Sequence, residues 1–227
     1  MAAELQVRRY EEKYLLAPAQ AAALQNLLDG VLQRDRYSAN GAYFIRSLYF
    51  DTPEDADYKD KLLGVSERKK LRLRLYDVQA QQVKLEIKAK RAKNSHKQSA
   101  VLDRSTALAL VNGDPTPLLA EGPAARAAYA LYQGEHRAPA ALIDYERTAW
   151  VFPVGRARIT LDSHVRASKS DSLFEANVPM VGVLDPMTIL EVKYDRPLPP
   201  WLGRMLSSIP GAPMSISKYA MARARLY

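Results

Sequence analysis

The stretches KKLRLRLYD (69–77) and VKLEIKAK (83–90) decide the fold. In each of them charged and apolar residues alternate with a period of two, which is the pattern of a β-strand with one polar and one apolar face. The polar face of the first holds Lys70, Arg72 and Arg74, and that of the second holds Lys84, Glu86, Lys88 and Lys90. We therefore predict two strands whose polar faces are rich in cations.

The same alternation occurs elsewhere in the chain. It predicts strands at 156–163, at 189–195 and near the start of the chain around Lys13. Two further stretches, 42–52 and 141–152, are rich in aromatic and β-branched residues, which favour strands. Together these segments indicate a mainly antiparallel sheet.

Six helices are predicted beside the strands. Pro18 opens an Ala- and Leu-rich run to about Leu32, and Thr52-Pro53 predicts a second helix that starts at Pro53 and ends near Gly64. The other four are expected at 104–112, 123–132, 200–208 and 218–227. The predicted fold class is α+β with helices flanking the sheet, and 227 residues suit a single domain spanning 1–227.

The composition points to a polyanionic partner. Lys and Arg number 33 against 25 Asp and Glu, which gives a net charge of +8 and a pI near 9.6. The absence of cysteine excludes disulfides and thiolate metal sites and favours the reducing cytoplasm. We expect a soluble, cytoplasmic chain, because no stretch has the apolar core of a signal peptide or the roughly 20 apolar residues of a membrane span.

The cationic strand faces allow two interpretations. They could be solvated outer faces of a half-buried sheet. Like charges on neighbouring strands repel, however, and exposed sheet faces usually mix both signs, so repeated cationic faces favour an anion held among them. If the sheet closes into a barrel, its lumen would be lined by Arg and Lys and would suit an extended anion.

Three carboxylates interrupt these faces, namely Glu11, Glu86 and Glu191. Each could simply balance a neighbouring Lys or Arg. Alternatively, oxygen ligands without Cys or a His cluster suit Mg²⁺ or Mn²⁺, which binds through one or two carboxylates, phosphates and water. No glycine-rich phosphate loop and no nucleophile elbow occurs. Phosphate handling by side chains is the chemistry that remains.

The chain resembles the vacuolar transporter chaperone (VTC) domain, the polyphosphate polymerase module of the triphosphate tunnel superfamily. Eight strings, in the family's order and spread over nearly the whole chain, carry the resemblance. They are RYEEKYLL (9–16), RSLYFDT (46–52), KLRLRLYD (70–77), KLEIKAK (84–90), DYERTAW (144–150), RITLDS (158–163), LEVKYD (190–195) and SISKY (215–219).

The resemblance implies an eight-stranded antiparallel tunnel with a polar, cationic lumen. Such a tunnel binds ATP or another nucleoside triphosphate with Mn²⁺ or Mg²⁺ and transfers the γ-phosphoryl group onto inorganic polyphosphate. The implied catalytic residues are Lys13, Arg72, Arg74, Lys88, Arg147, Arg158 and Lys218. Predicted substrate-binding residues are Glu11, Arg46, Lys70, Glu86, Lys97, Tyr145 and Lys193. Lys97 follows the basic part of the run KAKRAKNSHK (88–97), and the alternative for it is a solvated basic loop. Glu191 resembles the metal ligand.

One position departs from the family's pattern. Ser215 stands where relatives tend to have a lysine, which leaves one cation fewer. It could mean a weaker hold on the chain, a hydrolytic preference, or compensation by Lys169 or Arg204. The alternatives to a polymerase are therefore a hydrolase of tripolyphosphate or nucleoside triphosphates, and a non-catalytic polyphosphate binder. Nucleic acid is not expected, because the basic faces alternate with Leu, Val and Ile rather than aromatic platforms.

Overall fold

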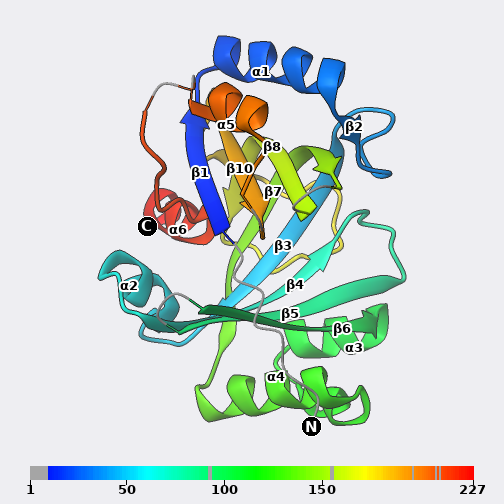
Figure 1. The fold of residues 1–227 in the computed structure, drawn as a ribbon. Helices are drawn as coiled ribbons and strands as arrows, with labels where there is room; N and C mark the ends of the chain where they lie inside the picture. The colour runs from blue at the N-terminus through cyan, green and yellow to red at the C-terminus, as the bar shows by residue number, and fades with distance from the viewer. Residues whose placement is uncertain (1–9, 92–93, 154–155, 196, 208, 210) are drawn as a thin grey trace, which may run out of the picture. The chain divides into compact units, whose positions relative to one another are not determined.

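The chain divides into two compact units, each assembled from three separate stretches. Figure 1 shows the computed structural model, which describes residues 10–91, 94–153, 156–195, 197–207, 209 and 211–227. Unit 1 takes 1–43, 145–165 and 184–216, and unit 2 takes 44–144, 166–183 and 217–227. The single domain expected from the length stays a prediction.

The strands form an antiparallel sheet of ten strands in the order β1-β10-β8-β7-β3-β4-β5-β6, with β2 beside β7 and β9 beside β8. Their bounds are β1 Tyr10–Leu16, β2 Gln33–Arg34, β3 Tyr43–Asp51, β4 Glu67–Leu75, β5 Gln82–Arg91, β6 Asn94–Asp103, β7 Ala138–Phe152, β8 Ala157–Ser168, β9 Val181–Gly182 and β10 Thr188–Tyr194. The two strands at the ends of this order, β1 and β6, do not pair with each other over the described residues, so the sheet is open. The α+β class is confirmed, whereas the closed tunnel is not.

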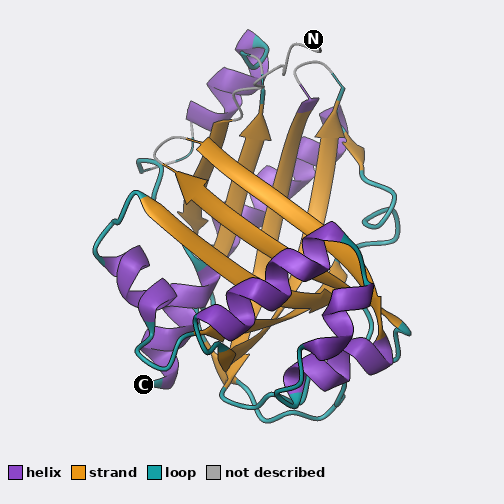
Figure 2. Ribbon diagram, turned by 90° about the horizontal axis from the view of Figure 1, so that it is seen from below, coloured by secondary structure: helices purple, strands orange, loops and turns teal. Residues whose placement is uncertain are grey.

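The six predicted helices are present, together with a short 3₁₀ segment. Their bounds are α1 Pro18–Val31, α2 Ala56–Leu62, α3 Arg104–Val111, η1 Thr116–Ala120, α4 Pro123–Gly134, α5 Pro200–Ser207 and α6 Lys218–Leu226. Figure 2 draws the helices in purple and the strands in orange. Within the described ranges no helix is long and apolar enough to cross a membrane.

The predicted start of α2 at Pro53 is wrong. The helix begins at Ala56, after Asp55 in the left-handed region at φ 60°. The side chain of Asp51, at the end of β3, accepts from the backbone N–H groups of Asp57 at 2.9 Å and Tyr58 at 3.1 Å. Because this carboxylate satisfies the first free N–H groups of a helix, the helix begins where Asp51 can reach.

The core of unit 1 lies between α1 and strands β1 and β10. Leu16, Leu28, Trp150 and Leu190 are almost fully enclosed there, and α1 contacts both strands. The residues between these apolar positions therefore form the opposite, polar face of β1 and β10.

The core of unit 2 lies under β4 and β5. Leu71, Leu73 and Leu75 are each at most 1% exposed, and α3 and α4 cover the strands at this side, as Figure 1 shows in green. The predicted phase of β4 is thereby confirmed. Arg72 and Arg74 stand on the face opposite this core.

A solvated loop, which was the alternative interpretation of the basic run around Lys97, is not what the described residues form. Asn94–Asp103 forms β6, which pairs with β5 from Gln82↔Asp103 to Arg91↔Asn94, while residues 92–93 lie outside the described part. Its sequence NSHKQSAVLD has few apolar residues, so the strand depends on its hydrogen bonds with β5. The pairing places Lys97 opposite Lys88.

Candidate functional site

A buried carboxylate surrounded by cations marks the polar face of unit 2. The Glu86 side chain on β5 is 2% exposed. Its Oε2 accepts from Arg72 Nε at 2.7 Å and Nη2 at 2.6 Å and lies 3.6 Å from Arg74 Nη1, while its Oε1 contacts Lys97 Nζ. Burial alone would raise the pKa of Glu86, but Arg72, Arg74 and Lys97 lower it to about 2. Glu86 is therefore ionised at neutral pH.

The cations of this cluster continue towards the start of α6. Lys70 Nζ donates to Ser217 Oγ at 2.8 Å, and Ser217 is the N-cap of α6, whose first residue is Lys218. Lys88 is exposed and pairs in register with Lys70 on one side and Lys97 on the other. Unit 2 thus brings together the predicted residues of β4, β5, β6 and the first turn of α6.

Arg46 is placed differently from the other predicted residues of unit 2. It is 2% exposed and donates from Nε and Nη2 to both carboxylate oxygens of Asp144 at 2.8 Å. Its Nη1 donates to the carbonyls of Leu173, at 3.4 Å, and Glu175. No interaction in the described part joins it to Glu86, so its position suits the packing of 173–175 against the sheet.

Two carboxylates and two lysines alternate across β1 and β10 in unit 1. Lys13 pairs in register with Glu191, and Glu11 with Lys193. Lys13 Nζ lies 2.8 Å from Glu11 and 3.3 Å from Glu191, and Lys193 contacts Glu191. Burial opposes the charge of Lys13, but Glu191 and Glu11 outweigh it and raise its pKa.

Each predicted arginine of unit 1 also has a carboxylate partner. Arg147 donates to both oxygens of Asp162, at 2.6 and 2.7 Å, and its guanidinium lies 5.4 Å from the ring centroid of Tyr145. Arg158 donates to Asp35 at 2.6 Å and to the Tyr43 hydroxyl at 3.2 Å. Burial lowers the pKa of Arg147, but the charge of Asp162 more than compensates and raises it.

These contacts bear on both earlier interpretations of the strand faces, since Lys84 and Lys88 of β5 are exposed. Glu86, Arg147 and Glu191 are 2%, 8% and 6% exposed, so the interpretation of solvated outer faces is wrong for them. Glu86 and Glu191 do balance neighbouring cations, as the simpler interpretation of the acids expected.

The residue that the sequence reasoning missed is Tyr49. Its hydroxyl accepts from Arg72 Nη1 at 2.8 Å. The segment 42–52 was predicted as a strand because it is rich in aromatic and β-branched residues, and no polar face was assigned to it. The signal was present, since Ser47, Tyr49 and Asp51 follow one another at every second position and so share a face.

The oxygen donors of unit 1 would suit a divalent cation only if phosphate oxygens and water completed its coordination. Glu11 and Glu191 both contact Lys13, and Thr160, opposite Glu191 in register, has a buried Oγ1 without a hydrogen-bond partner among the described residues. Among all the residues that the structure describes, no group of three or more His, Cys, Asp and Glu is arranged to hold a metal. Two carboxylates completed by phosphate oxygens and water are the usual surroundings of Mg²⁺.

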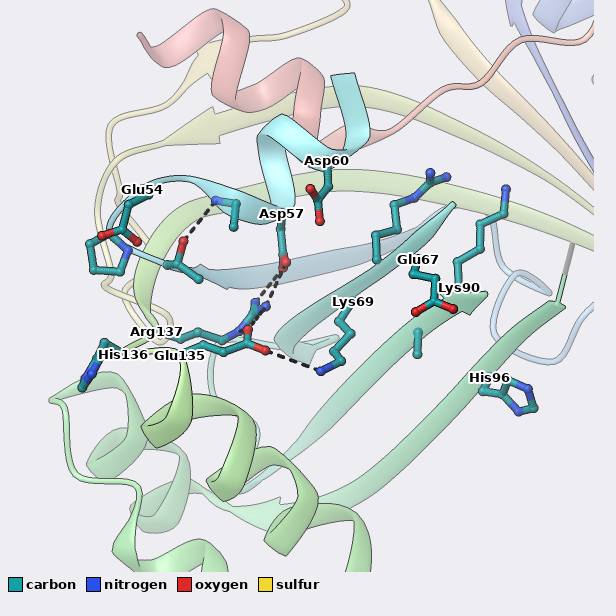
Figure 3. A pocket seen from close by; sticks show the side chains of 15 residues that line it. Glu54, Asp57, Asp60, Glu67, Lys69, Lys90, His96, Glu135, His136 and Arg137 are labelled. Atoms are coloured by element: carbon teal, nitrogen blue, oxygen red, sulfur yellow. Dashed lines mark hydrogen bonds and ion pairs between the residues drawn. The ribbon is translucent and has the colours of Figure 1, made fainter. Parts of the chain in front are cut away.

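A cavity lies within unit 2. It has a volume of about 880 Å³ and is lined by residues around the start of α2, the start of β4 and the end of α4. Figure 3 shows the ion pair of Arg137 with Asp57 and that of Lys69 with Glu135 at its wall. None of the predicted site residues lines this cavity.

The family resemblance is confirmed by a comparison with protein-family models. A family model described as the VTC domain matches residues 8–227. A protein from Pyrococcus horikoshii OT3 has a similar fold, with a TM-score of 0.51 at 12% identity, over 96% of this chain and 99% of that one. A Bacillus halodurans protein, provisionally described as an adenylate cyclase, gives a TM-score of 0.49 at 12% identity over 88% of each chain. No curated protein matches the chain.

Proposed function

Because the chain belongs to the VTC domain family, we propose that it is a polyphosphate polymerase that transfers the γ-phosphoryl group of ATP onto inorganic polyphosphate. The observation that supports this most is the buried Glu86 cluster, in which Arg72, Arg74 and Lys97 converge on one carboxylate. Phosphate oxygens engage the same guanidinium forks as a carboxylate does. The cluster is therefore preorganised for a phosphate anion.

The residues would act by position and charge. Arg72, Arg74, Arg147 and Arg158 would hold non-bridging oxygens, with Tyr145 beside Arg147, while Lys13, Lys88, Lys97 and Lys218 would orient the phosphate chain. The acceptor is a phosphate oxygen that is already ionised near neutral pH, so no general base is needed. The described pairings leave the sheet open. The closed eight-stranded tunnel is therefore a proposal and not an observation.

Glu191, together with Glu11, would hold Mn²⁺ or Mg²⁺. These two carboxylates share the ammonium group of Lys13, so they can also share a cation. The ion would neutralise charge on the phosphates during transfer. The lysines beside these carboxylates would then be released to contact phosphate.

Hydrolysis of the triphosphate at the same residues is the second candidate function. It is favoured by Ser215, which is exposed and stands where relatives tend to carry a lysine. One cation fewer would weaken the hold on a polyphosphate acceptor, and water would replace it. The two reactions differ in product and not in the residues they use.

Incubation with ATP and Mn²⁺, followed by gel separation of the products, tests the proposal. A polymerase gives a ladder of polyphosphate, and a hydrolase gives free phosphate only. Arg72→Ala should lower kcat/KM by about 100-fold or more, as expected for a residue that stabilises transferred charge. Arg126→Ala, an exposed position on α4, is the control and should behave as wild type. The proposal would be contradicted if the protein formed neither polyphosphate nor free phosphate, or if Arg72→Ala kept full activity.

A further inference from the structure

Tyr49 holds the guanidinium group of Arg72 from the side opposite Glu86. The two residues are direct partners in the pairing of β3 with β4. Arg72 Nη1 donates to the Tyr49 hydroxyl at 2.8 Å, while Nε and Nη2 donate to Glu86 at 2.7 and 2.6 Å. One hydrogen-bond partner therefore lies on each neighbouring strand, and together they determine how Arg72 is oriented.

The Tyr49 ring is itself fixed by packing. It is 7% exposed and stacks on the ring of Tyr219 from α6, with centroids 5.0 Å apart and planes 24° from parallel. The Tyr219 hydroxyl bonds to Asp51, so α6 cannot easily shift relative to β3. The Tyr49 hydroxyl consequently has a constant position from which to hold Arg72.

The charged groups around Tyr49 are mainly cations. Arg72, Arg74 and Lys70 of β4 act on its hydroxyl, Lys70 also lying 5.2 Å from the ring centroid of Tyr219. Negative charge comes from Glu86 of β5, behind Arg72, and from Asp51, which bonds to Tyr219. An ionised Tyr49 would thus have positive neighbours on its own side of the cluster.

We propose that Tyr49 is a positioning residue of the phosphate site: its neutral hydroxyl keeps Arg72 open to phosphate, whereas its phenolate would occupy Arg72 and exclude the anion. This inference rests on the proposed function, because it assigns a role to Arg72 in binding phosphate. It adds a regulation by pH that Glu86, already ionised at neutral pH, cannot supply.

The direction of the pH effect follows from the surroundings of Tyr49. Burial would raise the pKa of Tyr49, but Arg72, Arg74 and Lys70 outweigh burial and lower it to about 8. A bound polyanion adds negative charge nearby and so favours the neutral hydroxyl. Phosphate affinity should be fully present below this pKa and fall by up to about tenfold per pH unit above it.

Binding of tripolyphosphate to the full chain, measured by calorimetry from pH 7 to pH 9.5, tests the inference. Tyr49→Phe keeps the ring and removes the hydroxyl. At pH 7 it should bind about three- to tenfold more weakly than wild type, because Arg72 is less well oriented. As the pH rises through 8, only wild type should lose affinity, so the ratio of the two dissociation constants falls. Taking this ratio cancels the titration of the ligand itself.

Tyr129→Phe is the matched control, since it removes a tyrosine hydroxyl from α4, on the core side of β5 and β6. It should retain the wild-type pH profile. An absorbance titration adds a second readout: wild type should show a tyrosinate that forms near pH 8, is shifted upwards by tripolyphosphate and is missing in Tyr49→Phe.

The outcomes separate this inference from the proposed function. If Tyr49→Phe weakens binding by the same factor at every pH, or not at all, the positioning role is refuted while the function stands. If wild type binds tripolyphosphate with the expected pH profile but forms no product from ATP, the function is refuted and the role of Tyr49 stands. Wild type that fails to bind tripolyphosphate refutes both.

Discussion

At the scale of single residues, a side chain of this sheet is buried and still ionised. Glu86 is 2% exposed, yet it is kept ionised because Arg72, Arg74 and Lys97 approach it from β4 and β6. Removing one partner of such a cluster leaves a charge without its counter-charge where little water can reach it, which destabilises the fold. Glu86 therefore affects both the stability of unit 2 and the readiness of its cations.

Glu86 should make the protein's stability depend on acid. Its pKa in the folded chain is lowered to about 2 from 4.5. Its contribution is therefore complete above pH 4.5 and is lost as the pH falls towards 2, amounting to about 3 kcal/mol. Urea unfolding at pH 7 and pH 3 should show a smaller acid loss for Glu86→Gln than for wild type. Equal losses in both proteins would contradict this, and Glu54→Gln, at an exposed position, serves as control.

Glu191 should determine the requirement for metal. Replacing this carboxylate by Gln removes a charged oxygen ligand while preserving the size of the side chain. We expect Glu191→Gln to raise the Mn²⁺ concentration needed for half-maximal turnover by at least about tenfold. Glu146→Gln, on the exposed side of β7, should leave it unchanged. Metal-dependent turnover of Glu191→Gln equal to that of wild type would show that the metal is held elsewhere.

At the scale of elements, α6 depends on its N-cap. Ser217 Oγ accepts from the Ala220 N–H at 3.3 Å and from Lys70 Nζ at 2.8 Å. Ser217→Ala should cost about 1 kcal/mol of unfolding free energy, the usual effect of losing a cap. Ser207→Ala, at the exposed end of α5, should cost less than about 0.5 kcal/mol. An effect of Ser217→Ala no larger than that of Ser207→Ala would argue against the cap.

The elements that the sequence predicts well are those with a regular pattern of their own. β4 and β5 could be predicted with their phase because apolar residues occur at every second position. β6 could not, because its few apolar residues are supported by backbone pairing with β5 rather than by alternation. The start of α2 was missed for a related reason, since the side chain of Asp51 determines it from the end of β3.

The candidate site divides in the same way. Arg72, Arg74 and Glu86 could be assigned to one face from the alternation alone. Their contacts with Lys97 and Tyr49 could not, because those depend on which strands become neighbours. Arg46 shows a further contact that the string could not predict, namely its buried ion pair with Asp144. Pairing over long sequence distances is the information that a single sequence lacks.

At the scale of the whole molecule, a net charge of +8 attracts any polyanion, so selectivity must come from the faces themselves. Aromatic rings do accompany the arginines, but Tyr49 and Tyr145 are 7% and 3% exposed. Buried rings cannot stack on nucleic acid bases. These faces should therefore bind phosphate chains in preference to nucleic acid, because the rings of Tyr49 and Tyr145 are buried.

Competition measures this selectivity. At 0.15 M salt, where exposed charges are screened beyond about 8 Å, unlabelled polyphosphate should displace labelled tripolyphosphate. Single-stranded RNA with an equal number of phosphates should displace it at least about tenfold less effectively, because the rings of Tyr49 and Tyr145 beside the arginines are buried and cannot stack on its bases. Equal displacement by RNA would contradict the assignment and favour a general polyanion binder.

The division of the chain into interleaved stretches also has an evolutionary consequence. β7 begins in unit 2 and continues into unit 1, and each unit collects three stretches of the chain. A single crossover between genes at any position from 44 to 216 would therefore divide both units. Neither unit is continuous in the chain, so neither can be exchanged as one uninterrupted segment of a gene.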